Sequence, residues 1–174
     1  YDEALRFYEK SLEHCVKIKR KDFEAAAVGN IASIYRRKEM YDEAMKHVQK
    51  AVEIAKEIGP KRNLAIGYND IAQIYLKQEK FNDAIVYATK GINLSDSIAS
   101  LHPMMNGYKI RYTANKKIGK LRSALSDLEQ LKDTNDSILD ITKSKQIEEL
   151  KTAYETEKKE QQIAQQETEI NLLE

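Results

Sequence analysis

The sequence is poor in residues that cross-link, kink or interrupt a polypeptide chain. Among its 174 residues there are one Cys, two Pro, six Gly and no Trp. The single cysteine, Cys15, has no partner for an intrachain disulfide, which excludes a disulfide-stabilised fold. There is also no run of 18 apolar residues and no signal-peptide pattern. What remains, with 33% charged and 7% aromatic residues, is typical of a helix-rich protein.

The charges of the chain are almost balanced. Lys and Arg total 29 and Asp and Glu total 28, so the net charge is +1. A nearly neutral chain has no global basic field to attract nucleic acid or an anionic membrane. We therefore expect no direct contact with nucleic acid or with a membrane.

Side chains that commonly perform catalysis or hold metals are scattered along the sequence. His14, His47 and His102 have no Cys or acidic partner at a recognised metal-ligand spacing. The glycines form no phosphate-binding loop, and Cys15 lies among apolar neighbours, as a small core residue does. These patterns predict no catalytic residue, no metal and no cofactor. An enzyme would need an acid–base pair that the sequence does not reveal.

One four-residue phrase returns at a fixed interval. It reads Tyr-Asp-Glu-Ala at 1–4 and 41–44, Phe-Asn-Asp-Ala at 81–84, and Leu-Arg-Ser-Ala at 121–124. Each copy begins 40 residues after the previous one. A fixed period of this size is typical of stacked helical repeats, in which each repeat packs only against its neighbours.

Apolar residues recur at three- and four-residue spacing through and between these phrases, which predicts amphipathic helices. Gly59-Pro60 predicts a helix end, because Gly permits a left-handed turn and Pro cannot continue the hydrogen-bond ladder. Ser100 and Pro103 predict a helix start, and Gly119 predicts another end. The expected helices cover residues 1–18, 22–38, 42–58, 62–78, 82–98, 103–118 and 121–138.

The pattern within each pair of helices resembles the tetratricopeptide repeat. The residues that carry the resemblance are Val28, Ile31, Ala32, Tyr35, Tyr41, Ala44, Val48 and Ala51, and then Tyr68, Ile71, Ala72, Tyr75, Phe81, Ala84, Ala88 and Gly91. Small residues among them allow helices to cross closely. The resemblance implies an all-α fold, a right-handed superhelical solenoid of antiparallel helix pairs. Repeats of 40 rather than 34 residues look like those of kinesin light chains and bacterial quorum-peptide receptors.

The expected organisation is a tetratricopeptide-type array over residues 1–138, followed by a C-terminal helix over 139–174. The array comprises a half repeat at 1–20 and repeats at about 22–60, 62–100 and 103–138. Because the chain opens within a repeat and without Met, we expect the natural protein to extend upstream. The last repeat departs from the pattern, since Arg111, Tyr112 and Asn115 stand where Leu, Ala and Tyr are expected.

Residues 139–174 are rich in Gln and Glu and lack the 40-residue phrase. Their apolar positions follow an interrupted heptad pattern, which predicts one long helix that caps the array and then forms a coiled coil. Such a polar helix is marginal alone, so a partner chain, as in a homodimer, is expected. The candidate dimer positions are Ile147, Leu150, Tyr154, Ile163, Ile170 and Leu173.

In tetratricopeptide proteins the first helix of each pair lines a concave groove, and the resemblance implies a protein or peptide ligand there. Amide side chains suit a peptide backbone, and Lys or Arg suits a carboxylate, so an extended peptide or an acidic helix would fit. The alternative is that each residue is merely a solvated polar side chain. The candidate groove residues are Asn30, Ser33, Arg37, Asn69, Gln73, Lys77, Lys109, Thr113 and Lys116.

The succession of long repeats, a closing Asp-Ser-Ile at 136–138 and a Lys/Glu/Gln-rich helix resembles an arrangement in Bacteroidetes-type regulators. In those proteins the repeats precede a coiled coil, a membrane helix, and a histidine kinase or helix-turn-helix output domain. The resemblance implies the sensing region of a bacterial signal-transduction or transcription regulator, on the periplasmic side of a membrane. The alternative is a cytoplasmic scaffold or co-chaperone-like adaptor without signalling output.

Overall fold

The computed structural model describes the backbone of residues 1–171. It describes the side-chain surroundings of residues 1–142, 144, 145, 148, 149, 151, 152, 155, 156, 159, 160, 162 and 163. The chain forms two compact units, Tyr1–Thr134 and Asn135–Glu174. Within the described residues no helix is both long and apolar enough to cross a membrane.

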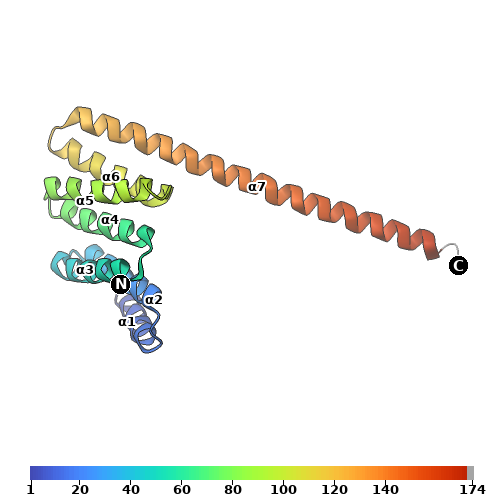
Figure 1. The fold of residues 1–174 in the computed structure, drawn as a ribbon, viewed down its shortest axis with the longest axis horizontal. Coiled ribbons are helices and arrows are strands. Elements are labelled where there is room, and N and C mark those ends of the chain that lie inside the picture. The colour runs from blue at the N-terminus through green and yellow to red at the C-terminus, as the bar shows by residue number, and fades with distance from the viewer. Residues whose placement is uncertain (172–174) are drawn as a thin grey trace. The chain divides into compact units, whose positions relative to one another are not determined.

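Seven α-helices account for the described backbone, which confirms the all-α prediction (Figure 1). They are α1 (Asp2–Lys17), α2 (Lys21–Arg37), α3 (Tyr41–Ile58), α4 (Lys61–Lys77), α5 (Phe81–Asp96), α6 (Leu101–Lys117) and α7 (Leu121–Asn171). The last helix runs without a break through both the segment predicted at 121–138 and the one predicted from 139.

In the unit Tyr1–Thr134, consecutive helices from α1 to α6 contact each other. The first helices of the pairs, α2, α4 and α6, also contact one another in sequence, and we call them the first-helix layer. Close contact depends on small residues, because Ala32, Ala44, Ala72 and Ala84 are almost completely buried. Cys15 is also buried at 7% exposure, which confirms the predicted core role.

The turns obey a strict interval of 20 residues. The residue that follows each helix at this interval has a positive φ, at Lys19 (55°), Glu39 (62°), Gly59 (91°), Glu79 (59°), Ala99 (49°) and Gly119 (75°). In five of these turns the next amide donates to a carbonyl five residues back, as Met40 N does to Tyr35 O at 2.9 Å. Only Gly59 and Gly119 predict a left-handed turn from the sequence, because the other four residues carry side chains that usually disfavour a positive φ.

The pairs of helices are closed by two kinds of contact at equivalent positions. Tyr35 stacks on His47 with ring centroids 5.3 Å apart, and Tyr75 meets Tyr87 at 5.6 Å. Forty residues further on, Asn115 and Asp127 take these places, and Asn115 Nδ2 donates to Asp127 Oδ2 at 2.9 Å. The departure of the last repeat from the family pattern is therefore a change in the chemistry of its core.

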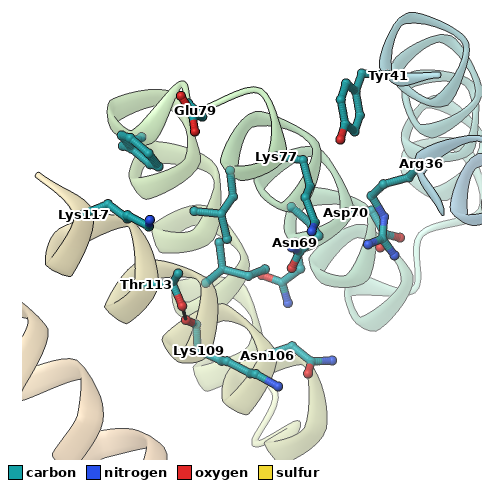
Figure 2. Close-up of a pocket in the computed structure, with 14 residues that line it drawn as sticks. Arg36, Tyr41, Asn69, Asp70, Lys77, Glu79, Asn106, Lys109, Thr113 and Lys117 are labelled. Atoms are coloured by element: carbon teal, nitrogen blue, oxygen red, sulfur yellow. Dashed lines mark hydrogen bonds between the residues drawn. The ribbon is translucent and has the colours of Figure 1, made fainter. Parts of the chain in front are cut away.

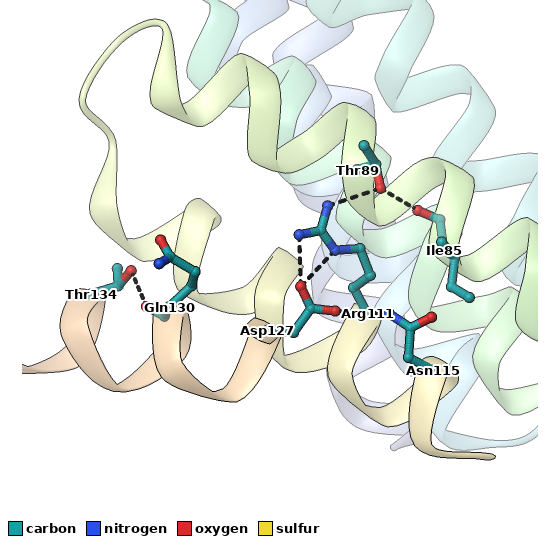
Figure 3. Close-up of polar contacts among 7 residues, drawn as sticks. All are labelled: Ile85, Thr89, Arg111, Asn115, Asp127, Gln130 and Thr134. Carbon is teal, nitrogen blue, oxygen red and sulfur yellow. Dashed lines mark hydrogen bonds and ion pairs between the residues drawn. The ribbon is translucent and has the colours of Figure 1, made fainter. Parts of the chain in front are cut away.

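A buried ion pair completes the polar contact in the last repeat. Arg111 donates from Nε and Nη2 to Asp127 Oδ1 at 2.9 and 2.7 Å (Figure 3). Its Nη1 donates to Thr89 Oγ1 at 3.2 Å, and that hydroxyl donates to the Ile85 carbonyl. The Asp127 side chain is only 4% exposed, so the carboxylate depends on Arg111 and Asn115 for its hydrogen bonds. Arg111 thus joins α5, α6 and α7 within the unit.

The unit Asn135–Glu174 is helical through Asn171. Leu139 and Ile141 are about half exposed, at 48% and 60%. Lys145 and Glu149, one turn apart, form an exposed ion pair of 3.7 Å.

Candidate functional site

Two cavities open on the first-helix layer. The α4–α6 cavity has a volume of about 720 Å³ and is lined by Arg36, Tyr41, Asn69, Asp70, Gln73, Leu76, Lys77, Glu79, Phe81, Asn106, Lys109, Ile110, Thr113 and Lys117 (Figure 2). The α2–α4 cavity has about 340 Å³ and is lined by Asp22, Ala25, Ala26, Gly29, Asn30, Ser33, Ala51, Ala55, Asn63, Ile66, Gly67 and Asp70. Asp70 lines both, so the two cavities adjoin at this residue, and together we call them the groove, which reaches three successive repeats.

The two cavities carry opposite charges. Four cationic side chains line the α4–α6 cavity, against the two carboxylates of Asp70 and Glu79. The α2–α4 cavity has no Lys or Arg in its lining and two carboxylates, Asp22 and Asp70. A ligand that spans the groove therefore meets a negative region at α2 and a positive region at α6.

Asp70 lies where the two cavities meet. It is half-buried, and among the described residues its carboxylate has neither a hydrogen-bond donor nor an ion-pair partner. Burial raises the pKa of this carboxyl to about 6, against a smaller opposing effect of the positive charge of Arg36. Figure 2 shows both residues on the same side of the cavity, and Arg36 Nη2 donates to Ser33 Oγ at 3.3 Å. The groove thus contains a carboxylate without a partner.

Seven of the nine predicted groove residues line these cavities. Gln73, Lys77, Lys109, Thr113 and Asn69 line the α4–α6 cavity, and Asn30 and Ser33 line the α2–α4 cavity. Arg37 and Lys116 line neither. The structure therefore brings together most of the predicted groove residues, but it divides them between two cavities.

Asn69 lies in the floor of the groove with only 5% of its surface exposed. Its Nδ2 donates to the Pro103 carbonyl at 2.7 Å, which ties α4 to the start of α6. Its Oδ1 has no hydrogen-bond partner and faces Gly91 and Gly107, where an added Cβ would lie 2.3 and 3.1 Å from that oxygen. We conclude that Asn69 holds two helices of the groove together rather than standing in it as an exposed side chain.

Two lining residues, Asp70 and Lys117, were not predicted from the sequence, because each lies one residue after a predicted position. The position of Asn30 recurs 40 residues later at Asp70, not at Asn69. The position of Lys77 recurs at Lys117, not at Lys116. Strict use of the 40-residue interval would have found Asp70 and Lys117. The aromatic and apolar lining, such as Tyr41 and Phe81, belongs to the recurring phrase and was assigned to packing.

The candidate dimer positions fall in the unit Asn135–Glu174. Ile163 is 55% exposed. Ile147, Leu150, Tyr154, Ile170 and Leu173 lie outside the residues whose side chains are described. The dimer helix therefore remains a prediction. Across the described part of the chain, no three His, Cys, Asp or Glu side chains form a group that could hold a metal ion.

Comparison with known proteins follows the repeat pattern. The family model described as "Tetratricopeptide repeat" matches residues 1–57 and 22–97, together more than half of the chain. No curated protein gave a significant match.

Several solved structures share the fold at low sequence identity. BtubC (BKLC) from P. vanneervenii has a TM-score of 0.69 and 16% identity, over 79% of this chain and 57% of that one. A kinesin light chain-like repeat protein from Podosopora anserina has a TM-score of 0.61 and 16% identity, over 79% and 68%. Aspartyl phosphate phosphatase F from Bacillus subtilis has a TM-score of 0.59 and 18% identity, over 80% and 42%. The chain thus spans a little over half the length of BtubC.

Proposed function

The chain belongs to the tetratricopeptide repeat family, and we propose that its groove binds an extended peptide segment of a partner protein. Repeats of this family form protein-interaction modules. The observation that carries the proposal is the continuity of the groove. Polar side chains from α2, α4 and α6 line two cavities that share Asp70, so a single extended ligand can contact three repeats. The proposed activity is binding without catalysis.

The chemistry of the lining supports a peptide. Gln73 and Asn106 provide both donors and acceptors for a peptide backbone, and Lys77, Lys109 and Lys117 offer ammonium groups to carboxylates. Tyr41 and Phe81 add apolar surface on which a ligand side chain can pack. The lining is mainly polar, with apolar surface at Tyr41, Leu76, Phe81 and Ile110, which suits a segment that carries both polar and apolar side chains.

We further propose that this groove is the sensing region of a larger bacterial regulator. Support comes from the resemblance of the Asp-Ser-Ile segment and the following long helix to regulators that place a coiled coil after their repeats. One similar structure is an aspartyl phosphate phosphatase and another is RapI, which has a TM-score of 0.57 and 14% identity over 79% of this chain and 58% of that one. The fold that they share with this chain is compatible with a regulatory role.

The binding proposal is tested by selection of random linear dodecapeptides displayed on phage against the chain of residues 1–174. We expect enriched peptides to bind the wild type and to bind Gln73→Trp at least about 10-fold more weakly, because Trp fills the α4–α6 cavity. The matched control is Gln49→Trp, an exposed position on α3 outside both cavities. Equal affinity for the two variants, or no enrichment, contradicts a peptide-binding groove.

The regulator proposal is tested separately. It predicts that the natural reading frame continues beyond residue 174 into a membrane helix and a kinase or helix-turn-helix domain. It also predicts that a selected peptide changes the hydrodynamic radius or the pairing of the C-terminal helix, measured by analytical ultracentrifugation. A reading frame that stops shortly after the helix, with no change on binding, favours a scaffold or adaptor.

A further inference from the structure

The α2–α4 cavity has walls of small and apolar side chains. They come from three helices and comprise Ala25, Ala26 and Gly29 of α2, Ala51 and Ala55 of α3, and Ile66 and Gly67 of α4. A Cβ added at Gly29 would meet no atom within 4 Å, so this wall faces open space. The volume of about 340 Å³ lies within the range of ligand pockets, which begins at about 300 Å³. The cavity can therefore hold the apolar part of a ligand side chain.

Only carboxylates contribute charge to this lining, and only one of them has no partner. Asp22 forms an ion pair with Arg20, with Nη2 to Oδ2 at 2.8 Å and Nε to Oδ1 at 3.0 Å. Asp70, which also lines the cavity, accepts no hydrogen bond from any described residue. The positive charge of Arg36 lowers the pKa of Asp70, but Arg36 Nη2 donates its hydrogen bond to Ser33 Oγ.

We propose that the α2–α4 cavity is a subsite for a Lys or Arg side chain of the bound peptide. The aliphatic stem of that side chain lies against the Ala and Gly walls, and its cationic head pairs with Asp70. Lys and Arg combine an apolar stem with a cationic end. The stem matches the apolar walls of the cavity, and the cationic end matches the carboxylate of Asp70. This subsite rests on the proposed peptide-binding function, and it requires that the bound peptide contain a Lys or Arg residue.

The adjoining cavity sets a second requirement on the same peptide. Lys77 follows Asp70 by seven residues on α4, which is about 10 Å along the helix axis at 1.5 Å per residue. About three residues of an extended peptide cover this distance. A peptide that lies along α4 therefore meets Asp70 with a basic residue and Lys77 with an acidic residue about three positions away. The groove would thus select both charge and direction.

The desolvated state of Asp70 is consistent with this role. Burial raises the pKa of its carboxyl to about 6, so the ionised form is less stable here than in water. An ammonium or guanidinium group beside the carboxylate would stabilise its negative charge and so offset the hydration that is lost on burial. Structural carboxylates in this chain differ, since Asp127 has both Arg111 and Asn115 as partners.

The test uses the random dodecapeptide library on the wild type and on Asp70→Asn, with Asp83→Asn as the matched control on an exposed position outside both cavities. We expect Lys and Arg to be enriched at one position in the wild-type and Asp83→Asn pools and not in the Asp70→Asn pool. In the strongest wild-type binder, replacement of that Lys by norleucine keeps the stem and removes the charge. It should weaken binding about 10- to 100-fold to the wild type and less than about 2-fold to Asp70→Asn.

Two further variants separate the outcomes. Gly29→Leu fills the cavity and leaves Asp70 in place, so it should weaken the Lys peptide at least about 10-fold. An acetylated peptide distinguishes a Lys side chain from a free amino terminus. Two results overturn the subsite and leave the proposed peptide-binding groove intact. In the first, selected peptides lose binding on Gln73→Trp and yet show no enrichment of Lys or Arg. In the second, the norleucine peptide loses the same affinity for the wild type and for Asp70→Asn. Failure to select any peptide overturns both proposals.

Discussion

The middle repeats and the last repeat close the same helix interface with different chemistry. In the middle repeats the interface contains stacked or tilted rings, Tyr35 on His47 and Tyr75 with Tyr87. In the last repeat the equivalent side chains, Asn115 and Asp127, are hydrogen-bonded to each other and Asp127 is paired with Arg111. The backbone period of 40 residues is the same in both. The comparison shows that the repeat geometry tolerates a change from aromatic to polar side chains at this interface, while the buried alanine of the phrase is kept at Ala124.

The two solutions differ in what happens when one member is lost. An aromatic pair contributes buried area and a modest preferred geometry, so each ring retains most of its contacts alone. A buried charge depends on its partner, because an unpaired ion in a protein interior is expensive. A single substitution in this interface should therefore lower the free energy of unfolding more in the last repeat than in the middle repeats. Replacing all members of the polar network together should lower it less than removing one.

The largest effect is expected from Asp127→Ala. The substitution leaves the Arg111 guanidinium, whose side chain is 23% exposed, without its carboxylate, and leaves Asn115 Nδ2 without an acceptor. We expect the free energy of unfolding to fall by about 3 to 5 kcal/mol. Chemical denaturation followed by circular dichroism measures it. Glu129→Ala, on an exposed position of the same helix, should change it by less than about 0.5 kcal/mol. Equal effects of the two would contradict a buried network.

A concerted exchange tests whether the two interfaces are interchangeable. Arg111→Ile, Asn115→Tyr and Asp127→Tyr together give the last repeat the residues Ile71, Tyr75 and Tyr87 of the preceding one. Replacement of a buried ion pair by packed apolar residues is often neutral or stabilising. We expect the triple variant to be about 3 kcal/mol more stable than Asp127→Ala and close to the wild type in the same denaturation experiment. A triple variant as unstable as Asp127→Ala would show that the last repeat needs its charges.

Close packing in the middle repeats is tested by Gly91→Ala. The new Cβ would lie 2.3 Å from Asn69 Oδ1 and 3.3 Å from the Ala65 carbonyl oxygen, and Asn69 cannot move without losing its bond to Pro103. We expect a loss of about 1 to 3 kcal/mol in the free energy of unfolding. Gly29→Ala is the control, because its Cβ meets open space and Ala favours a helix by up to about 1 kcal/mol. A gain at both positions would refute the close approach of α4 and α5.

The smallest effect concerns Asp70, whose place in the last repeat is taken by the buried Ile110. Its folded pKa of about 6 lies above the ordinary 3.8, so the folded state binds the proton more tightly than the unfolded state. The wild type should therefore gain stability relative to Asp70→Asn as the pH falls from 7 through 6 to about 4. We expect a gain of roughly 1 to 2 kcal/mol, allowing for partial exposure to water. A pH-independent difference in denaturation free energy would show that this carboxyl is not desolvated.

The sequence predicted the fold well because the period is carried by packing residues. Alanines such as Ala44 and Ala84 recur where helices cross, and any larger side chain there would separate them. The polar network was visible only as a departure at Arg111 and Asn115. Its partner Asp127 occupies an ordinary helical position, and nothing local identifies a carboxylate as buried. Tertiary contacts between α6 and α7 decide that.

The groove was predictable in outline and not in detail. Residues on the first helices were nominated by family position, and seven of nine line a cavity. The lining of the α2–α4 cavity also includes Ala51 and Ala55 of α3, and the positions of first helices do not predict a contribution from the second helix of a pair. Asn69 and Asp70 are adjacent in sequence but differ by 100° around the helix, so one ties α6 and the other faces the ligand space.

The turns at 20-residue intervals have a consequence for how such a protein can change over generations. Each helix from α1 to α6 is followed by a residue in the left-handed conformation at the same position of the turn, so the junctions between these helices are interchangeable. Duplication of residues 41–80 joins Lys80 to Tyr41, which reproduces both the native step from Met40 to Tyr41 and that from Lys80 to Phe81. One recombination event therefore adds a whole helix pair without inventing a new turn. Gene duplication or deletion can therefore lengthen or shorten the groove by one helix pair at a time, and with it the number of ligand residues that the groove contacts.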